Sequence, residues 1–195
     1  MKRIAISFIL LLPFLHSYTQ TWTDAQLDSA DTAGDISYLT EIEKDAIQYI
    51  NLARLYPQLF ITYELENYMG VASAGENLKN SSFKKSLIKQ LKTQKPAAAL
   101  QFDKGLYDLA DCFAKESGDK GLVTHKRKRC SYGYSGECCC YGVDTGKDIA
   151  IEWLIDDKVD DLGHRVNCLN KDYSFIGLAF HSHKKYRFCA VADFR

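Results

Sequence analysis

Apolar residues recur at helical spacing in the first two thirds of the chain. Thr40 and Glu43 form a capping box, in which the two side chains bond the free backbone amides at a helix start. Behind them apolar residues continue with helical periodicity as far as Tyr56, and Pro57 then predicts the end of the helix. Similar signals predict three more helices, which begin near Ser82, Asp103 and Thr145. Gly121 marks the end of the second of these.

The last part of the chain has the pattern of β-strands. Tyr173–Phe180 and Tyr186–Phe194 are rich in aromatic and β-forming residues, and the polar segment His181–Lys185 separates them. We therefore expect a hairpin with His181–Lys185 at its tip. The segment Cys130–Gly142 is rich in Gly, Ser, Tyr and Cys, which indicates a cross-linked loop or a short strand. Helices followed by strands are typical of the α+β class.

The N-terminus has the pattern of a secretory signal peptide. A basic start is followed by an apolar run from Ile4 to Leu15, which is far shorter than the roughly 20 residues that span a bilayer. Ser17 and Thr19 place small residues at the −3 and −1 positions of a cleavage site. We expect cleavage to leave Gln20 as the new N-terminus.

The sequence therefore divides into a signal peptide at 1–19, a loosely held polar leader at 20–38 and one domain at 39–195. Loss of Lys2 and Arg3 lowers the number of basic residues from 25 to 23, against 25 acidic residues, which gives a net charge of −2. Nothing in this balance indicates nucleic-acid binding, and no second hydrophobic span is found. We expect a secreted or periplasmic protein without a membrane span.

The chain has seven cysteines, and export predicts that most of them form disulfides. They are Cys112, Cys130, Cys138, Cys139, Cys140, Cys168 and Cys189. Because seven is odd, at least one thiol is free or pairs with another molecule. A bridge between adjacent cysteines is strained, so we expect the triplet Cys138–Cys140 to pair with Cys130 and with Cys168 or Cys189.

Histidines and acids at separated points of the chain can converge on a metal or on a proton-transfer site. Short motifs surround them in a fixed order. In chain order the motifs are Asn51–Leu–Ala–Arg54, Thr124–His125, Gly136–Glu137, Trp153, Gly163–His164–Arg165 with Asn167, and Phe175–Ile–Gly177. Each motif alone is weak evidence, but the ordered series is fairly specific.

This series resembles the cysteine-rich secretory protein/antigen 5/pathogenesis-related superfamily, also called the CAP or SCP-like domain, and its bacterial-type members in particular. The resemblance runs from about residue 41 to residue 195. It implies a three-layer α-β-α sandwich with a small antiparallel sheet. It also implies a central cleft lined by histidines and acids, which in some members holds a divalent metal.

Carried onto this chain, the resemblance implies a cleft cluster of His125, Glu137, Asp156 and His164. The two histidines are then the metal ligands, and weakly bound zinc is the expected cofactor. Asp156 stands three residues after Trp153, as the second acid does in many eukaryotic members, although an acidic insertion follows it here. Gly75–Glu76–Asn77 spells the family tripeptide outright, but it precedes His125, so chain order favours Glu137.

Other polar clusters favour structural interpretations. His181 and His183 form a His-x-His pair that could chelate on a strand, but their place between two strands favours a hairpin tip. The aspartates within 156–161 lack the glycine and glutamate of an EF-hand loop, which favours a solvated loop. The basic run Lys126–Arg129 argues against a metal at His125, because nearby positive charge opposes a dication; if these side chains point into solvent, the penalty is screened.

Three functions remain open. The first is binding of a small hydrophobic ligand (a lipid or sterol) or an extracellular protein partner, as the resemblance implies. The second is a metal-dependent hydrolase, in which zinc held by His125 and His164 activates water and Glu137 takes the proton. Two histidines are fewer than the three protein ligands common in catalytic zinc sites, which favours binding. The third is a cysteine-dependent hydrolase built on the triplet with His125, which disulfide formation would prevent.

Overall fold

The computed structural model describes residues 21–71 and 77–195. The expected signal peptide at 1–19, its cleavage site before Gln20 and Gly75–Glu76 of the family tripeptide lie outside the described residues. Within the described ranges, no helix is both long enough and apolar enough to cross a bilayer.

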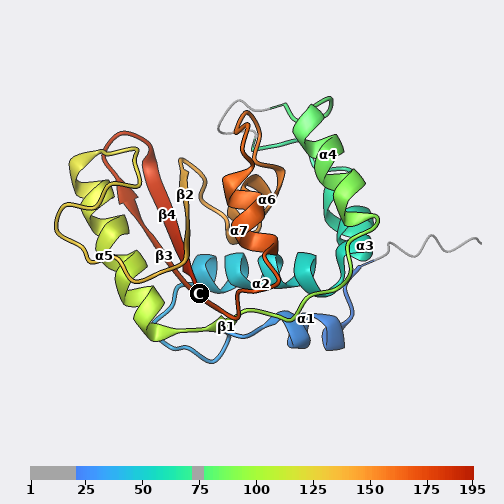
Figure 1. Ribbon diagram of the computed structural model, residues 1–195, viewed down its shortest axis with the longest axis horizontal. Helices are drawn as coiled ribbons and strands as arrows, with labels where there is room; N and C mark the ends of the chain where they lie inside the picture. Colours follow the sequence, from blue (N-terminus) through green and yellow to red (C-terminus); the bar gives the residue numbers. More distant parts are fainter. Residues whose placement is uncertain (1–20, 72–76) are drawn as a thin grey trace, which may run out of the picture.

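The chain folds into three layers, with a four-stranded sheet between helices (Figure 1). The strands, in sheet order, are β1 (Gln101–Phe102), β3 (Phe175–His183), β4 (Arg187–Phe194) and β2 (Gly136–Tyr141). The last three pair antiparallel, whereas the short β1 runs parallel to β3. One face is covered by α5 (Lys104–Lys120); the helices on the other face are α2 (Glu41–Leu55), α6 (Gly146–Ile155) and α7 (Gly163–Leu169). The predicted α+β class and α-β-α sandwich are confirmed.

The four predicted helices are present as α2, α4 (Ser82–Leu91), α5 and α6. Thr40 and Glu43 make both bonds of the predicted capping box at the start of α2. The N-caps of the other three are Ser81, Asp103 and Thr145, the first of them one residue earlier than predicted. Gly121 ends α5 in the left-handed conformation, with φ of 64°, which glycine adopts without strain.

Side chains alternate between the two faces of the sheet and so build two cores. Cys139, Cys189 and Val191 pack with Phe113 of α5. On the other face Cys138 and its neighbours join the larger core of α2, α6 and α7. Since β2 is an edge strand, groups from both sides of the sheet can meet along it.

The Asn-Leu-Ala-Arg motif of α2 is a structural device. The buried Asn51 amide donates to the carbonyls of Ala30 and Leu100 and accepts from the backbone amide of Leu100. The guanidinium of Arg54 is also buried and donates to four backbone carbonyls. These belong to Ala98, Cys168, Asn170 and Tyr173. The motif therefore ties distant segments to α2.

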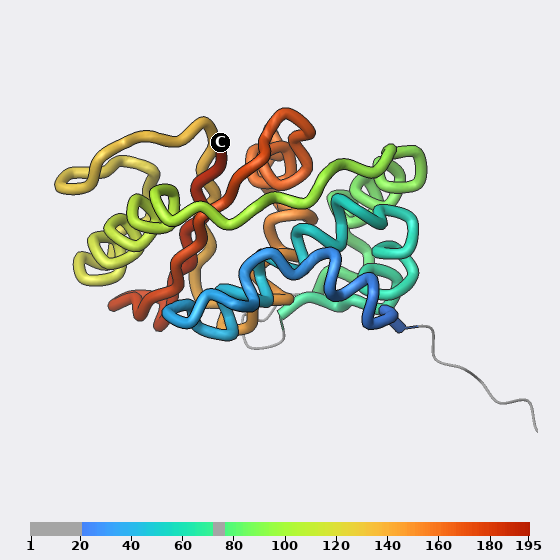
Figure 2. Tube along the Cα trace, turned by 90° about the horizontal axis from the view of Figure 1, so that it is seen from below, coloured from blue at the N-terminus to red at the C-terminus, as the bar shows by residue number. Residues whose placement is uncertain are grey.

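Residues 21–38 pack onto the domain, so the expectation of a loosely held leader is wrong for its described part. Helix α1 (Asp24–Ala30) starts with a complete capping box at Thr23. The Trp22 ring packs edge-on against Tyr63, with ring centroids 4.8 Å apart. Figure 2 shows this segment, in blue, lying along the helices coloured teal.

Three other segments differ from prediction. The short α3 (Pro57–Phe60) and the π-helical η1 (Ile61–Leu65) follow α2 directly. The Gly163–His164–Arg165 motif, for which no helix was predicted, forms the first turn of α7. Strand β3 runs through His183, so the hairpin tip is 184–186 instead of His181–Lys185.

Candidate functional site

The first pair of the expected cluster joins a loop to β2. His125 Nδ1 lies 2.8 Å from Glu137 Oε1, which hydrogen bonds to it. The imidazole is 58% exposed, whereas the Glu137 carboxylate is buried. The bond to Glu137 raises the pKa of His125, because the carboxylate stabilises the protonated ring.

The second pair lies where α6 gives way to α7. Asp156 is the C-cap of α6 and adopts a left-handed conformation with φ of 56°, which turns its buried side chain back toward the next helix. His164 Nδ1 lies 2.7 Å from Asp156 Oδ1. Asp156 Oδ2 accepts from the backbone amides of His164 and Arg165, the second and third residues of α7. The carboxylate therefore orients the ring and satisfies a helix start at the same time.

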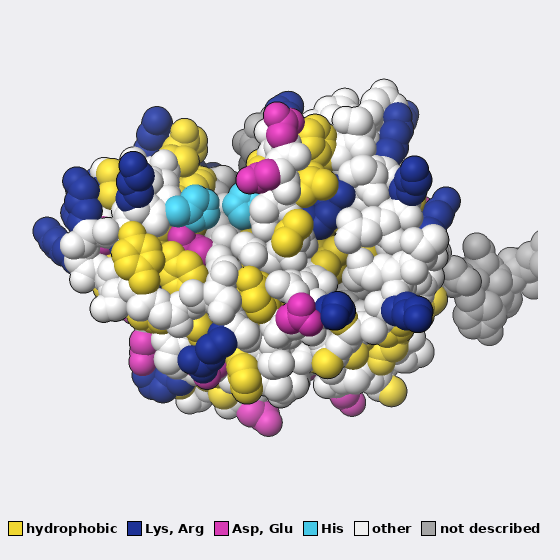
Figure 3. Space-filling model, viewed as in Figure 1, with side chains coloured by type: hydrophobic (Ala, Val, Ile, Leu, Met, Phe, Trp, Pro, Cys, Tyr) yellow, Lys and Arg dark blue, Asp and Glu magenta, His cyan; other side chains and the backbone are white. Residues whose placement is uncertain are grey.

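The two pairs face each other across the edge strand. The ring centroids of His125 and His164 are 6.3 Å apart. Figure 3 shows histidine side chains, in cyan, on opposite sides of a hollow in this surface. A hollow of about 180 Å³ is lined by His164, Asp156, Trp153 and Cys139, among others. The structure thus brings together all four side chains that the resemblance implied.

A buried charge cluster supports the first pair. Arg127 donates to Glu137 Oε2, and its Nη2 lies 2.8 Å from both carboxylate oxygens of Asp193. Burial raises the pKa of Asp193. The basic run Lys126–Arg129 does not point into solvent as a whole, because the side chain of Arg127 is fully buried. The other three residues of that run are exposed.

Arg127 and Asp193 were missed in the sequence interpretation. Arg127 stands among exposed cations, and nothing in the run distinguishes it. Asp193 did carry a signal, because it is a lone charge in the apolar segment Cys189–Phe194. A buried charge on a strand needs a partner of opposite charge.

The cysteine triplet contributes directly to the site. Cys139 Sγ lies 3.7 Å from His125 Nδ1, and ligand atoms of His125, Glu137 and Cys139 lie within 4.8 Å of one another. Because residues two apart on a strand share a face, Glu137 and Cys139 both point toward α5. Burial raises the pKa of the Cys139 thiol well above its usual range.

The expected disulfide partners of the triplet are partly wrong. Cys130 bonds to Cys112, not to the triplet, and so ties the loop that carries His125 to α5. The triplet cysteines are reduced, as are Cys168 and Cys189.

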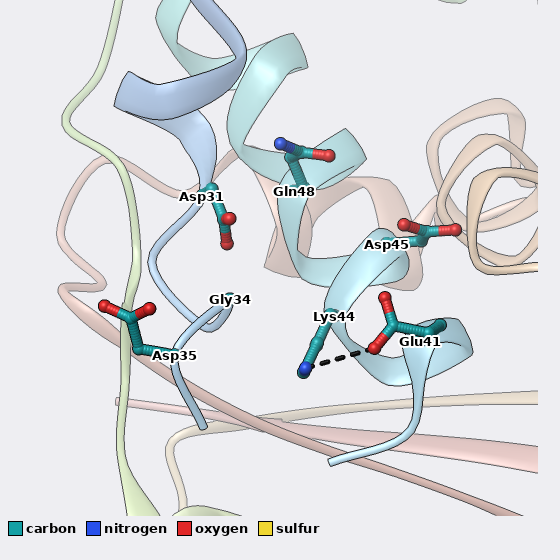
Figure 4. A pocket seen from close by; sticks show the side chains of 7 residues that line it. All are labelled: Asp31, Gly34, Asp35, Glu41, Lys44, Asp45 and Gln48. Carbon is teal, nitrogen blue, oxygen red and sulfur yellow. Dashed lines mark hydrogen bonds and ion pairs between the residues drawn. The ribbon is translucent and has the colours of Figure 1, made fainter. Parts of the chain in front are cut away.

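Polar groups elsewhere have structural partners. His181 Nε2 lies 2.7 Å from Asp111, and the buried His183 donates to the carbonyl of Leu122, so this pair forms no chelate between its own rings. A second hollow, of about 380 Å³, lies between the end of α1 and α2 (Figure 4). The residues that line it are far in sequence from His125 and His164. Its lining is largely acidic: Asp31, Asp35, Glu41 and Asp45, with Lys44 bonded to Glu41.

Comparison with known proteins identifies the family of this chain. The model of the Cysteine-rich secretory protein (CAP) family matches residues 47–194, which is most of the chain. The chain belongs to this family. CAP proteins are typically extracellular binding proteins and are generally not enzymes. The Cys112–Cys130 disulfide fits an extracellular location.

Several solved CAP-like structures are similar at low identity. An outer surface protein from Borrelia burgdorferi is 18% identical, with a TM-score of 0.40, over 57% of this chain and 86% of that chain. Venom allergen-like protein 4 from Schistosoma mansoni is 17% identical, with a TM-score of 0.40, over 57% and 82%. BmVAL-1 is 15% identical, with a TM-score of 0.47, over 82% and 79%. No curated protein matches the chain.

Proposed function

We propose that this CAP protein is exported and acts by binding, with a divalent metal held by His125 and His164 at the centre of its binding surface. The supporting observation is the pairing of each imidazole with a carboxylate through Nδ1. That arrangement fixes the ring orientation and leaves Nε2 of each ring as the metal ligand. A bound ion would supply a positive charge able to accept an oxygen ligand from a partner.

The ring positions fit a shared ion after a small adjustment. With zinc–nitrogen bonds near 2 Å and a tetrahedral angle, two imidazole centroids lie about 5 Å apart. The observed separation is 6.3 Å, and the exposed His125 ring has room to move. Two histidines leave the coordination shell incomplete, so we expect weak affinity and an open position for a ligand.

The surroundings favour a protein partner over a lipid. The hollow of about 180 Å³ is smaller than the roughly 300 Å³ at the lower end of small-molecule pockets. Exposed apolar side chains, Tyr132 and Val166, flank the histidines in sequence. The loop around His125 exposes Lys126 and Arg129, whereas the loop before His164 exposes Asp160 and Asp161. A partner with complementary charges could use both rims.

The hydrolase alternative has less support. Glu137 is bonded by His125 through one oxygen and by Arg127 through the other. Both oxygens of Asp156 are likewise engaged. Neither carboxylate is therefore placed as a free general base. The cysteine hydrolase is weakened because the Cys139 thiol is buried and its pKa is raised.

A second metal arrangement is favoured by one observation, the grouping of His125, Glu137 and Cys139. This site would use the other nitrogen of His125, and a neutral imidazole offers only one ligating nitrogen at a time. The two arrangements are therefore alternatives for one ion.

Zinc titration calorimetry tests both arrangements. For the histidine pair we expect His164→Ala to weaken zinc binding at least tenfold, while Cys139→Ser binds as the wild type does. The opposite result would assign the metal to the thiol site. His181→Ala, which removes an imidazole outside the cleft, is the matched control. Zinc affinity that none of these variants changes would refute a metal role for the cleft. A fluorescent sterol should bind none of these proteins, and saturable sterol binding would overturn the protein-partner proposal.

A further inference from the structure

Two buried thiols meet behind the cleft, between β2 and α7. Cys138 Sγ lies 3.6 Å from the backbone carbonyl of His164. Cys168 follows His164 by one helical turn, so it projects from the same face of α7 toward β2. Both thiols belong to the same core, and neither is accessible to solvent.

The backbones that carry these thiols are held close together. Asn167 donates to the carbonyl of Glu137, which bonds the residue before Cys168 to the residue before Cys138. Arg54 donates to the carbonyl of Cys168 and fixes its position against α2. A side chain at Gly136 would collide with Asn167, because its Cβ would lie 2.5 Å from the amide oxygen. A disulfide needs such close backbones, since its α-carbons lie roughly 4.4–6.8 Å apart.

The remaining reduced cysteines are less well placed to meet Cys168. Cys139 and Cys189 belong to the core on the α5 face of the sheet, whereas Cys138 and Cys168 belong to the core on the other face. Cys140 lies two residues beyond Cys138 on β2, farther along the strand from the Asn167–Glu137 bond. Strand alternation therefore excludes Cys139, and the place of Cys140 farther along β2 leaves Cys138 as the triplet member that faces Cys168.

We propose that Cys138 and Cys168 form a second disulfide in the exported protein, which bonds the helix that carries His164 to the strand that carries Glu137. The oxidant is a disulfide of the exporting compartment, either a small molecule or an oxidoreductase. While the chain is folding, before the two thiols are buried, one cysteine attacks the oxidant as the thiolate to form a mixed disulfide and releases the first thiol. The other cysteine then displaces the second thiol. Two electrons pass to the oxidant, two S–H bonds break and one S–S bond forms.

This cross-link would give the cleft a covalent support on its inner side. The Cys112–Cys130 bond ties the segment that follows His125 to α5 on one side of the sheet. A Cys138–Cys168 bond would tie α7 to the edge strand on the other side. Both histidines would then stand on segments that disulfides join to the rest of the fold.

Thiol counting on the full-length chain, recovered after export, tests the proposal. The protein is denatured without reductant, alkylated and weighed. The structure has five reduced cysteines, and loss of two to the new bond leaves three alkylated. Peptide mapping should find Cys138 linked to Cys168. Five alkylated cysteines, or a different partner for Cys138, would overturn the proposal.

The number of alkylated cysteines in two single variants gives a second test of the proposal. Cys168→Ser should free Cys138 and raise the number of alkylated cysteines from three to four. Cys189→Ser, which removes an equally buried thiol on the opposite face, should lower it from three to two. In a Cys112→Ser/Cys130→Ser background, reductant should still lower the urea midpoint of unfolding. A midpoint that reductant leaves unchanged there would contradict the second disulfide. Failure of this inference leaves the proposed metal site untouched, because zinc binding is measured separately.

Discussion

At the scale of single residues, the cleft is built from charge pairs in which each imidazole has its own carboxylate. Glu137 serves two cations at once, because one oxygen meets His125 and the other meets Arg127. Asp193 completes the group from the neighbouring strand, where it pairs with Glu137 in the sheet register. Two buried carboxylates around one guanidinium leave a negative excess, which a protonated His125 or a metal can offset.

The pKa of His125 should fall when its carboxylate is removed. Glu137→Gln deletes the negative charge that stabilises the imidazolium, so the midpoint of His125 should shift toward the ordinary value of about 6.5. NMR titration of the imidazole protons measures this, and His181 and His183 serve as internal controls. An unchanged His125 midpoint in the variant would contradict the pairing.

The direction of this shift also sets the pH dependence. Because the folded pKa is raised, protonated His125 stabilises the fold below about pH 6.5, and this contribution is lost as pH rises through the raised pKa. Metal competes with the same proton. As pH falls, zinc affinity should therefore decline earlier than for an ordinary imidazole.

Arg127 should be the most costly cation to remove from this region. Arg127→Met leaves Glu137 and Asp193 buried without their counter-ion, which typically costs about 3–5 kcal/mol. Urea unfolding at neutral pH measures the loss. The loss should shrink in acid, where the two carboxyl groups take up protons. Arg129→Met at an exposed position is the control, with an expected change within about 0.5 kcal/mol. Equal stability of the two variants would show that the guanidinium is not needed.

At the scale of elements, the predictions were correct where local sequence signals, such as helix caps, were enough to define a helix. Helices α2, α5 and α6 begin at side-chain caps that are legible in the sequence, and α5 ends at Gly121. Helix α7 has no such N-cap, because Leu162 makes no side-chain bond, and Asp156 instead bonds the amides of its second and third residues. The Thr23–Gln26 capping box of α1 was present but was obscured by the polar composition around it.

Contacts between distant elements were the part that local patterns could not reveal. The Gly-His-Arg motif and the helix that contains Trp153 indicated where His164 lies along the chain. That His164 lies close to His125 was predicted from the family resemblance and not from the local pattern. The burial of Arg127 depends on Glu137 and on Asp193, and Asp193 is 66 positions away in the sequence. The residues next to Arg127 in the sequence do not indicate that it pairs with Asp193.

Gly177 is required where α5 packs on β3. A Cβ at this position would lie 2.0 Å from the backbone nitrogen of Tyr107 and 2.3 Å from the carbonyl carbon of Leu106. Gly177→Ala must therefore push the helix away from the sheet, and we expect a loss of about 1–3 kcal/mol or more. Gly163→Ala is the control, since its Cβ would meet only ordinary contacts with Asp161. Urea unfolding compares them, and a Gly177→Ala protein as stable as Gly163→Ala would contradict the close packing.

At the scale of the whole molecule, the fold supports the cleft from both faces of the sheet. His125 comes from the α5 side and is tied there by Cys112–Cys130, whereas His164 comes from the α6 and α7 side. The N-terminal segment strengthens this frame, because Asn51 binds the carbonyl of Ala30 at the end of α1. Residues 21–38 belong to the folded domain and follow the expected cleavage site. Cleavage before Gln20 would therefore remove no described residue of that domain.

Export and oxidation should therefore be linked in one experiment. The full-length chain and a chain that starts with Met followed by Gln20 are expressed in the same bacterium. The full-length product should be recovered outside the cytoplasm with Gln20 as its N-terminus and the Cys112–Cys130 bond formed. The shorter product should stay in the cytoplasm with these thiols reduced.

The reduced form should also be less stable, because the disulfide joins residues 18 apart and loops of that size are worth about 3 kcal/mol. Intact mass and alkylation report the N-terminus and the oxidation state, and urea unfolding reports stability. Cys112→Ser in the full-length chain is the control, since it is exported without this bond. Exported protein that retains Lys2 and Arg3 would refute the signal peptide. If both products carry the Cys112–Cys130 bond to the same extent, disulfide formation does not depend on export.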